Sequence, residues 1–281
     1  MPGTLMVVGT PIGNLGDLSP RAQQALAECD FIAAEDTRVS LRLLNHFGIK
    51  KPMISYFEHN KLERGDIICA RIEAGENCAL VTDAGMPAIS DPGELLVAQC
   101  AERGIPVVVV PGPSAVISAL AVSGLPTGRF TFEGFLSTSK KSRREHLEQL
   151  RGERRTMVFY EAPHKLTATL QDLEKVFGAS RRIALVRELT KLHEEAIRTT
   201  LGEACQRFSA EAPRGEFVLV LEGETQPDEP VCATPEDALA LAQKLCEQGF
   251  SASEAAKRAA KESGMRKGEI YAALVSAGPS N

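Results

Sequence analysis

The sequence lacks several features that mark common classes of protein. Its 281 residues include no tryptophan and only three tyrosines. It has no run of about eighteen apolar residues, and its N-terminus lacks the basic-then-apolar order of a signal peptide. We therefore expect a cytoplasmic protein without a membrane segment. A hydrophobic content of 43% with 25% charged residues is the mixture of a globular protein with ample core.

Disulfide and metal-binding patterns are also missing. The sequence has seven cysteines, but no C-x-x-C pair and no combination of Cys with His at a metal-binding spacing. We predict reduced thiols, mostly in the core, and no metal site. The cysteines are Cys29, Cys69, Cys78, Cys100, Cys205, Cys232 and Cys246.

The two common phosphate-binding loops are absent as well. The stretch "GTPIGNLG" lacks the G-x-G-x-x-G spacing of a dinucleotide site, although Glu35 and Asp36 lie about where a ribose-binding acid is expected. Pro11 takes the place of the second glycine, and its ring would occupy the position of the pyrophosphate. No G-x-x-x-x-G-K-[ST] loop occurs in the chain. The pattern argues against a dinucleotide-dependent enzyme and against an NTPase.

The sequence does contain a series of short apolar runs separated by segments of helical period. The runs are "LMVV", "FIAA", "CALV", "VVVV", "TMVFY", "IALV" and "FVLVL". This alternation predicts an α/β fold with two α/β lobes, residues 1–118 and 119–224, and a ligand cleft between them. In the first predicted helix, Ser19 is the expected N-cap and Pro20 the first helical residue.

The C-terminal part has a different pattern. Residues 225–236 are acidic and contain prolines, which is typical of a linker. Residues 237–281 predict a small helical module, with helices at 237–248, 252–262 and 267–275. A turn at 263–265 gives the last two helices the outline of a helix-turn-helix, and a helical cap that aids dimerisation is the alternative.

Three loops rich in small residues and prolines each follow an apolar run. They are "GTPIGNLG", "TDAGMPAISDPG" and "PGPSA". At the carboxyl ends of parallel strands, such loops line the crevice where open α/β sheets bind ligands. Their backbone N–H and C=O groups suit a compact polar ligand with adenine, ribose and amino-acid parts.

With these loops, the chain resembles the tetrapyrrole methylase family, a class of S-adenosylmethionine methyltransferases in which two α/β lobes enclose the cofactor. The resemblance extends through "GTPIGNLGDLSPRA", "AAEDTR", "SYFEHN", "VTDAGMPAISDPG", "PGPSA", "FEGFL", "VFYEAPHK" and "GEFVLVLEG", in that order. "AAEDTR", "SYFEHN" and "DAGMPAISDPG" are typical of the RNA-directed branch, and Gly85-Met86-Pro87 stands where tetrapyrrole enzymes carry G-D-P. The resemblance implies a homodimer that transfers a methyl group from S-adenosyl-L-methionine to the 2′-oxygen of a cytidine in small-subunit rRNA. We expect the rRNA to be part of the assembled subunit, with naked rRNA as the alternative.

The resemblance also implies which residues contact the cofactor. These residues follow the motifs of both lobes. They are Ile12, Ala84, Gly85, Met86, Ile89, Ser114, Ala115, Glu161, Ala162, Leu189, Glu216 and Phe217.

Two polar clusters are candidates for catalysis, because a 2′-hydroxyl is a poor nucleophile that a nearby base would activate. Asp36 and Arg38 in "AAEDTR" either act on the substrate or form an ion pair that fixes a loop. His59 in "SYFEHN" either takes part in the reaction or is a turn histidine. The reaction requires no metal, and the sequence shows no Ser/His/Asp or Cys/His arrangement.

Positive charge is concentrated in one stretch of a chain whose net charge is −5. Residues 137–155 contain seven Lys or Arg against three Glu, which favours a phosphate-binding strip, with a solvated helix face as the alternative. Base stacking would fall to Tyr56, Phe57 or Phe135. The predicted RNA contacts are Lys140, Lys141, Arg143, Arg144, Arg266 and Lys267.

Two other functions are compatible with parts of the pattern. One is a methyltransferase that acts on a tetrapyrrole, and the basic stretch argues against it. The other is a non-enzymatic regulator with a ligand-sensing α/β core and a C-terminal helix-turn-helix, and the near-complete set of cleft loops argues against that.

Overall fold

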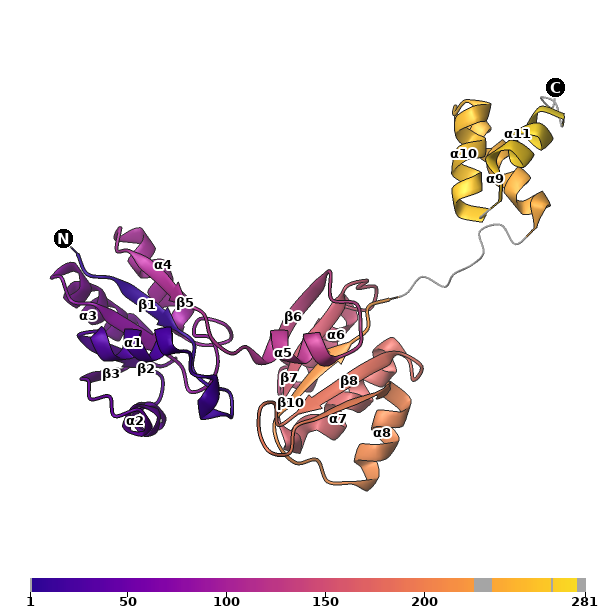
Figure 1. Cartoon of the computed structure of the whole chain (residues 1–281). Helices are drawn as coiled ribbons and strands as arrows, with labels where there is room; N and C mark the ends of the chain where they lie inside the picture. Colours follow the sequence, from indigo (N-terminus) through magenta and orange to yellow (C-terminus); the bar gives the residue numbers. More distant parts are fainter. Residues whose placement is uncertain (1, 225–233, 264, 277–281) are drawn as a thin grey trace. The chain divides into compact units, whose positions relative to one another are not determined.

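The computed structural model describes residues 2–224, 234–263 and 265–276, and the chain divides into two compact units, Met1–Gly223 and Glu224–Asn281 (Figure 1). Most of the predicted linker lies outside the described residues, as do Cys232 and Gly264 of the predicted turn. The expected α/β fold with a C-terminal helical module is confirmed. In the described parts of the chain, no helix is long and apolar enough to cross a membrane.

The first unit begins with a five-stranded parallel sheet of order β3-β2-β4-β1-β5. Helices α1 (Pro20–Glu28) and α2 (Thr37–His46) pack on one face, and α3 (Lys61–Glu73) and α4 (Gly93–Glu102) pack on the other. Burial on both faces explains why the three central strands β2, β4 and β1 are continuous apolar runs in the sequence. The strands are β1 (Leu5–Val8), β2 (Phe31–Ala34), β3 (Met53–Ser55), β4 (Cys78–Val81) and β5 (Val107–Val110).

The strand order creates a switch point between the neighbouring strands β1 and β4. The chain leaves β1 through α1 on one face of the sheet, and it leaves the adjacent strand β4 through α4 on the other face. The loops after β1 and β4 therefore diverge. Such a divergence leaves a crevice at the carboxyl ends of the strands, which is where open α/β sheets bind ligands.

The second sheet of this unit is mixed and has the order β6-β7-β10-β8-β9. Only β6 and β7 pair in parallel, and the other pairs of this sheet are antiparallel. Helices α6 (Lys140–Gln149), α7 (Pro163–Phe177) and α8 (Leu201–Ala210) cover one face. Helix α5 (Ala115–Val122) covers the other face, and it contains the boundary predicted between residues 118 and 119 (Figure 1). The strands are β6 (Phe130–Phe135), β7 (Thr156–Glu161), β8 (Arg182–Arg187), β9 (Glu195–Thr200) and β10 (Phe217–Leu221).

The second unit is a bundle of helices α9 (Pro235–Glu247), α10 (Ala252–Ser263) and α11 (Lys267–Ser276). Their ranges agree with the three helices predicted from the sequence. At the start of α9, Thr234 and Asp237 form a capping box, in which each side chain accepts from the other residue's backbone N–H. The core is small and mostly alanine, and its buried members are Ala238, Ala242, Ala256, Ala259 and Ile270.

Candidate active site

The first unit contains a cavity of about 510 Å³ that is lined by residues from both of its sheets. The parallel sheet contributes the end of β2 and the loops after β1, β4 and β5. The mixed sheet contributes residues at the ends of β6, β7, β8 and β10. Ligand sites typically measure roughly 300–1,000 Å³. The cavity therefore has the size of a small-molecule site and lies at the switch point of the parallel sheet.

Glycines let the loops of the parallel sheet approach one another closely. A Cβ added to Gly9 would lie 2.6 Å from the Cα of Gly112, so the loops after β1 and β5 touch through their backbones. Thr10 and Gly85 exchange backbone hydrogen bonds of 2.9 and 3.1 Å, which join the loops after β1 and β4. Gly85 has a φ of +88°, a conformation that favours glycine. The "GTPIGNLG" loop thus forms part of the cavity wall, with Ile12 in the lining.

Two loops around the cavity contain strained backbone at residues other than glycine. Ala88 and Ser90, after β4, have φ values of 68° and 65°, and Glu188 and Thr190, after β8, have φ values of 51° and 63°. A positive φ is an outlier for a β-branched residue such as threonine. Residues of this kind cost about 1–3 kcal/mol each and concentrate at functional sites. The strain supports the same location for the site as the cavity does.

All twelve residues assigned to the cofactor by resemblance line this cavity. Those on the parallel sheet and on α5 are Ile12, Ala84, Gly85, Met86, Ile89, Ser114 and Ala115, and those on the mixed sheet and its loops are Glu161, Ala162, Leu189, Glu216 and Phe217. The structure brings together residues that are more than 200 positions apart in the chain. Their contacts with a cofactor stay a prediction.

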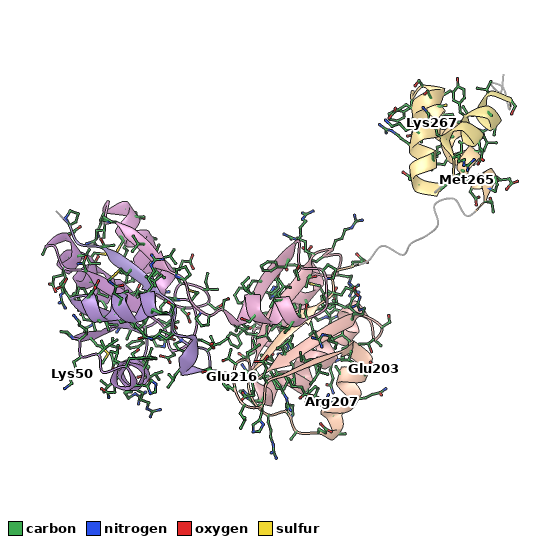
Figure 2. All side chains as sticks on the ribbon, in the orientation of Figure 1. Lys50, Glu203, Arg207, Glu216, Met265 and Lys267 are labelled. Carbon is green, nitrogen blue, oxygen red and sulfur yellow. The ribbon has the colours of Figure 1, made fainter. Side chains whose placement is uncertain are left out.

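Two charged side chains of the mixed sheet are held in place by their neighbours. Glu161 is 4% exposed, and its carboxylate accepts from Thr169 Oγ1 at 2.5 Å and from Ala162 N at 2.8 Å. Lys191 Nζ lies 3.1 Å from Glu188 Oε1 and 3.2 Å from an oxygen of Glu216, which Figure 2 labels. Burial alone would lower the pKa of Lys191, but the hydrogen bonds to the two glutamates outweigh it and raise the pKa. Lys191 therefore stays a cation whose charge is already balanced.

The three catalytic candidates lie outside the residues that line the cavity. Asp36 caps α2, because its Oδ1 accepts from Arg38 N at 2.8 Å, and its Oδ2 lies 2.6 Å from the Arg38 guanidinium. The hydrogen bonds from Arg38 lower the pKa of Asp36 to about 2. His59 is exposed, with its ring centroid 6.2 Å from that of Phe57. Asp36 and Arg38 thus form an ion pair at the start of α2, and the catalytic roles of Asp36, Arg38 and His59 stay predictions.

Sequence reasoning did not assign a group of acids in the cavity wall. Glu35 follows β2, Asp83 follows β4 and Asp91 precedes α4, and all three line the cavity. Burial, and then the charge of Glu35, raises the pKa of Asp83 and of Asp91, the latter to about 6. The sequence did indicate two of these acids, since Asp83 and Asp91 stand near the two ends of "TDAGMPAISDPG", a loop that was singled out for its small residues.

The predicted RNA contacts on α6 fall into two kinds. Arg143 is 13% exposed, and its guanidinium lies 2.7 Å from the carboxylate of Asp172, so it belongs to an ion pair within the fold. Lys140, Lys141 and Arg144 are exposed to solvent. We refer to these three residues as the α6 cations.

In the second unit, Arg266 and Lys267 are exposed at the start of α11. Lys267 Nζ donates to Ser253 Oγ of α10 at 3.1 Å. Figure 2 labels Lys267 together with Met265, which packs against the alanine core of the bundle. The contact of Arg266 and Lys267 with RNA stays a prediction.

Residues 4–205 match the model of the Tetrapyrrole (Corrin/Porphyrin) Methylases, and the chain belongs to this family of methyltransferases. It is similar to proteins named ribosomal RNA small subunit methyltransferase I. The one from Synechocystis sp. is 47% identical over 269 residues, which is 96% of each chain. The one from Pseudomonas aeruginosa is 45% identical over 271 residues, covering 96% of this chain and 95% of that protein. The one from Thermotoga maritima is 48% identical over 221 residues, covering 79% of this chain and 99% of that protein.

Solved structures also share the fold. Uroporphyrin-III-C-methyltransferase from Thermus thermophilus has a TM-score of 0.55 at 19% identity, over 78% of this chain and 94% of that chain. Diphthine synthase has a TM-score of 0.60 at 13% identity, over 78% of this chain and 90% of that chain. At these identities, the similarity establishes the common fold alone.

Proposed function

We propose that this enzyme uses S-adenosyl-L-methionine to methylate the 2′-oxygen of a cytidine ribose in small-subunit rRNA. The observation that carries the proposal is the cavity of about 510 Å³ in which three small-residue loops of the parallel sheet meet the mixed sheet, with all twelve assigned residues in its lining. The name shared by full-length relatives at 45–47% identity supports the choice of RNA as the substrate.

The residues of the cavity fit S-adenosylmethionine. Ile12, Met86 and Ile89 offer apolar surface for an adenine ring, and Asp83 and Glu35 make the wall negative, which suits a cationic ligand. Ser114 begins α5 as its N-cap without a side-chain capping bond, so its hydroxyl remains available to a polar ligand within the described structure. When bound, the cofactor supplies a methyl carbon that the adjacent sulfonium has already activated.

With an activated methyl group, the work of the protein is alignment and exclusion of water. Holding two reactants in line contributes roughly 7–11 kcal/mol to lowering a barrier. The strained loops after β4 and β8 and the touching backbones of Gly9 and Gly112 provide a rigid frame for this task. The RNA ribose would enter the same cavity, because the methyl donor and the acceptor oxygen must be in contact.

The exposed cations of both units are the parts that we assign to the RNA backbone. In the first unit these are the α6 cations, and Arg143 is not included, since its guanidinium is paired with Asp172. In the second unit they are Arg266 and Lys267 at the start of α11. On a chain of net charge −5, a local positive surface attracts phosphates and confines polyanion binding to that surface.

We also propose that the enzyme forms a homodimer. Val108 and Val109 are exposed on β5, which is an edge strand of its sheet, and Ile117 is exposed on α5. Exposed apolar side chains on an edge strand are a liability in a monomer and are usually covered. Light scattering should give twice the mass of one chain, and Val109→Lys should shift the protein toward the monomer if β5 forms the interface.

The function is tested by incubating the protein with S-adenosylmethionine labelled in the methyl group and one of three acceptors: naked small-subunit rRNA, assembled small subunits, or a precorrin. We expect label in RNA, recovered as 2′-O-methylcytidine after digestion to nucleosides. Label in the precorrin would instead make the enzyme a tetrapyrrole methyltransferase. Label in another nucleoside would contradict the proposed position of methylation.

A further inference from the structure

Three carboxylates in one wall of the cavity differ in how they are engaged. Asp83 Oδ1 accepts from Asp36 N at 3.1 Å, and Glu35 Oε2 accepts from Thr82 Oγ1 at 2.6 Å. The Thr82 hydroxyl also lies beside Asp91. It has only one hydrogen, however, and it donates that hydrogen to Glu35. Within the described residues, Asp91 is therefore the member of this group with the most acceptor capacity left for a ligand.

The backbone holds Asp91 firmly in the wall. Ala88 and Ser90, which come shortly before it, both have positive φ. Gly93, which begins α4 just after it, packs so closely that an added Cβ would lie 2.9 Å from Leu80 Cδ2 and 3.0 Å from Ala88 N. A strained loop that is packed against both β4 and α4 has little space to relax. Such support from rigid elements is what fixes a side chain for chemistry.

The charged groups around Asp91 come from several elements. Glu35 from the end of β2 and Asp83 from the loop after β4 are both acidic. Tyr160 of β7 lines the same cavity from the mixed sheet, and burial together with the Asp91 charge raises the pKa of that tyrosine. Lys191, a cation in the lining, is balanced by two glutamates. None of the charges that act on Asp91 from the described residues is a cation, so no ion pair within the fold uses its carboxylate.

We propose that Asp91 is the proton acceptor for the ribose hydroxyl, an inference that rests on the proposed function. In this step the 2′-oxygen uses a lone pair to form a bond with the methyl carbon. The bond from that carbon to sulfur breaks, its electron pair stays on sulfur, and the hydroxyl proton passes to the Asp91 carboxylate. The products are a methyl ether, a neutral thioether and a protonated Asp91, so atoms and charge balance.

The surroundings of Asp91 suit it to this role better than those of Asp36. Burial raises the pKa of Asp91 to about 6, and the charge of Glu35 contributes to the rise. The carboxylate is thus still ionised at neutral pH but is more basic than an ordinary aspartate. Asp36, by contrast, has a pKa of about 2 because Arg38 donates to it, and it lies outside the cavity. A base is most effective when its pKa approaches the working pH from below.

The test compares the parent with Asp91→Asn, Asp91→Glu and the control Asp66→Asn, which changes an exposed aspartate on α3 outside the cavity. Single-turnover methylation of small-subunit rRNA is measured from pH 5 to 9, and calorimetry measures the affinity for S-adenosylmethionine. Circular dichroism confirms that each variant is folded.

For Asp91→Asn, we expect a rate at pH 7.5 that is lower by about a hundredfold or more, with unchanged cofactor affinity. The rate of the parent should fall about tenfold per pH unit below pH 6, and this acid limb should be missing from Asp91→Asn. Asp91→Glu should recover part of the rate together with the acid limb, since it restores a carboxylate. Asp66→Asn should behave as the parent in every measurement.

Three results would overturn the role of Asp91. The first is an Asp91→Asn variant that methylates at the parental rate, and the second is an acid limb that persists in that variant. The third is a loss of cofactor affinity as large as the loss of rate, which would mean that the carboxylate holds the cofactor instead. A parent enzyme that binds the cofactor but transfers no methyl group to RNA would refute the proposed function itself, and the assignment of Asp91 with it.

Discussion

Replacing Asp91 by Asn should stabilise the fold at neutral pH, although it removes the proposed proton acceptor. The carboxylate of the parent is ionised at pH 8 in a partly buried wall next to the charge of Glu35. Desolvation and a like charge both disfavour the charged form. Asn has nearly the same shape as Asp and carries no charge. The substitution thus removes a cost that the folded state bears at a functional site.

The magnitude follows from the pKa of Asp91, which rises from 3.8 to about 6 in the folded protein. One pKa unit corresponds to about 1.4 kcal/mol, so the complete rise would correspond to roughly 3 kcal/mol. The carboxyl group is only partly buried, and solvent screens part of its interaction with neighbouring charge. We therefore expect the free energy of unfolding at pH 8 to increase by about 1 kcal/mol in Asp91→Asn.

The direction of the pH dependence follows from the raised pKa. The folded state binds the Asp91 proton more tightly than the unfolded state does. The stabilising contribution of this proton is complete below pH 3.8, where both states are protonated, and it is lost as the pH rises through about 6. Asn resembles the protonated form at every pH. The difference in stability between variant and parent should therefore be largest above pH 6 and should disappear below pH 4.

Urea unfolding followed by circular dichroism, without cofactor and at intervals from pH 4 to 8, measures this difference. Groups that titrate alike in both proteins cancel when the two curves are subtracted. Glu102→Gln is the control, because its carboxylate is exposed on α4 outside the cavity and forms no ion pair among the described residues, so its charge contributes little to stability. If Asp91→Asn is no more stable than the parent at pH 8, or if its advantage persists at pH 4, the account of the Asp91 environment is wrong.

The remaining predictions concern the cofactor, the RNA and the second unit. Gly85→Leu should abolish S-adenosylmethionine binding in calorimetry, because it adds a side chain to the cavity wall, and its φ of +88° should cost about 1–2 kcal/mol in stability. The control Gly104→Leu carries similar backbone strain at φ +68° outside the cavity and should bind the cofactor normally. Replacing the α6 cations by Gln should flatten the slope of log RNA affinity against log salt by about two, whereas Arg143→Gln should lower stability and leave the slope unchanged. If the triple variant and Arg143→Gln have equal slopes, the phosphates bind elsewhere. Truncation after Gly223 preserves the first unit, and its length matches the 221-residue alignment with the Thermotoga relative, so cofactor affinity should be kept while binding to the small subunit weakens. An unchanged methylation rate at subsaturating subunit concentration would show that α9–α11 are dispensable.

Local features of the chain could be predicted because they depend on neighbours in the sequence. Ser19 caps α1 as expected, with its Oγ accepting from Ala22 N at 3.1 Å, and Pro20 is the first residue of that helix. The three helices of the second unit were predicted for the same reason, since their apolar positions repeat at helical spacing. The three small-residue loops were placed at strand ends by the apolar runs that precede them. Each of these inferences requires only a short window of residues.

The assignment of Asp91 as the proposed proton acceptor was not predictable in the same way. Asp36, Arg38 and Asp91 are all charged residues next to a predicted strand or helix, and nothing in a short window separates them. Packing places Asp91 in the cavity wall and raises its pKa, whereas Arg38 engages Asp36 outside the cavity and lowers its pKa. Arg143 is a similar case, because Asp172, which pairs with it, lies 29 positions further along the chain.

By itself, the sequence determined the alternation of strands and helices, the position of the small-residue loops and the family to which the chain belongs. Those properties follow from periodicity, turn chemistry and motif order, which are written along the chain. The tertiary structure alone decided which loops share a cavity, which acid faces it and which cations are left exposed. The physical reason is that burial, partner charges and strand order depend on residues far apart in the sequence, and these set the pKa and the reach of each side chain only once the sheets have formed.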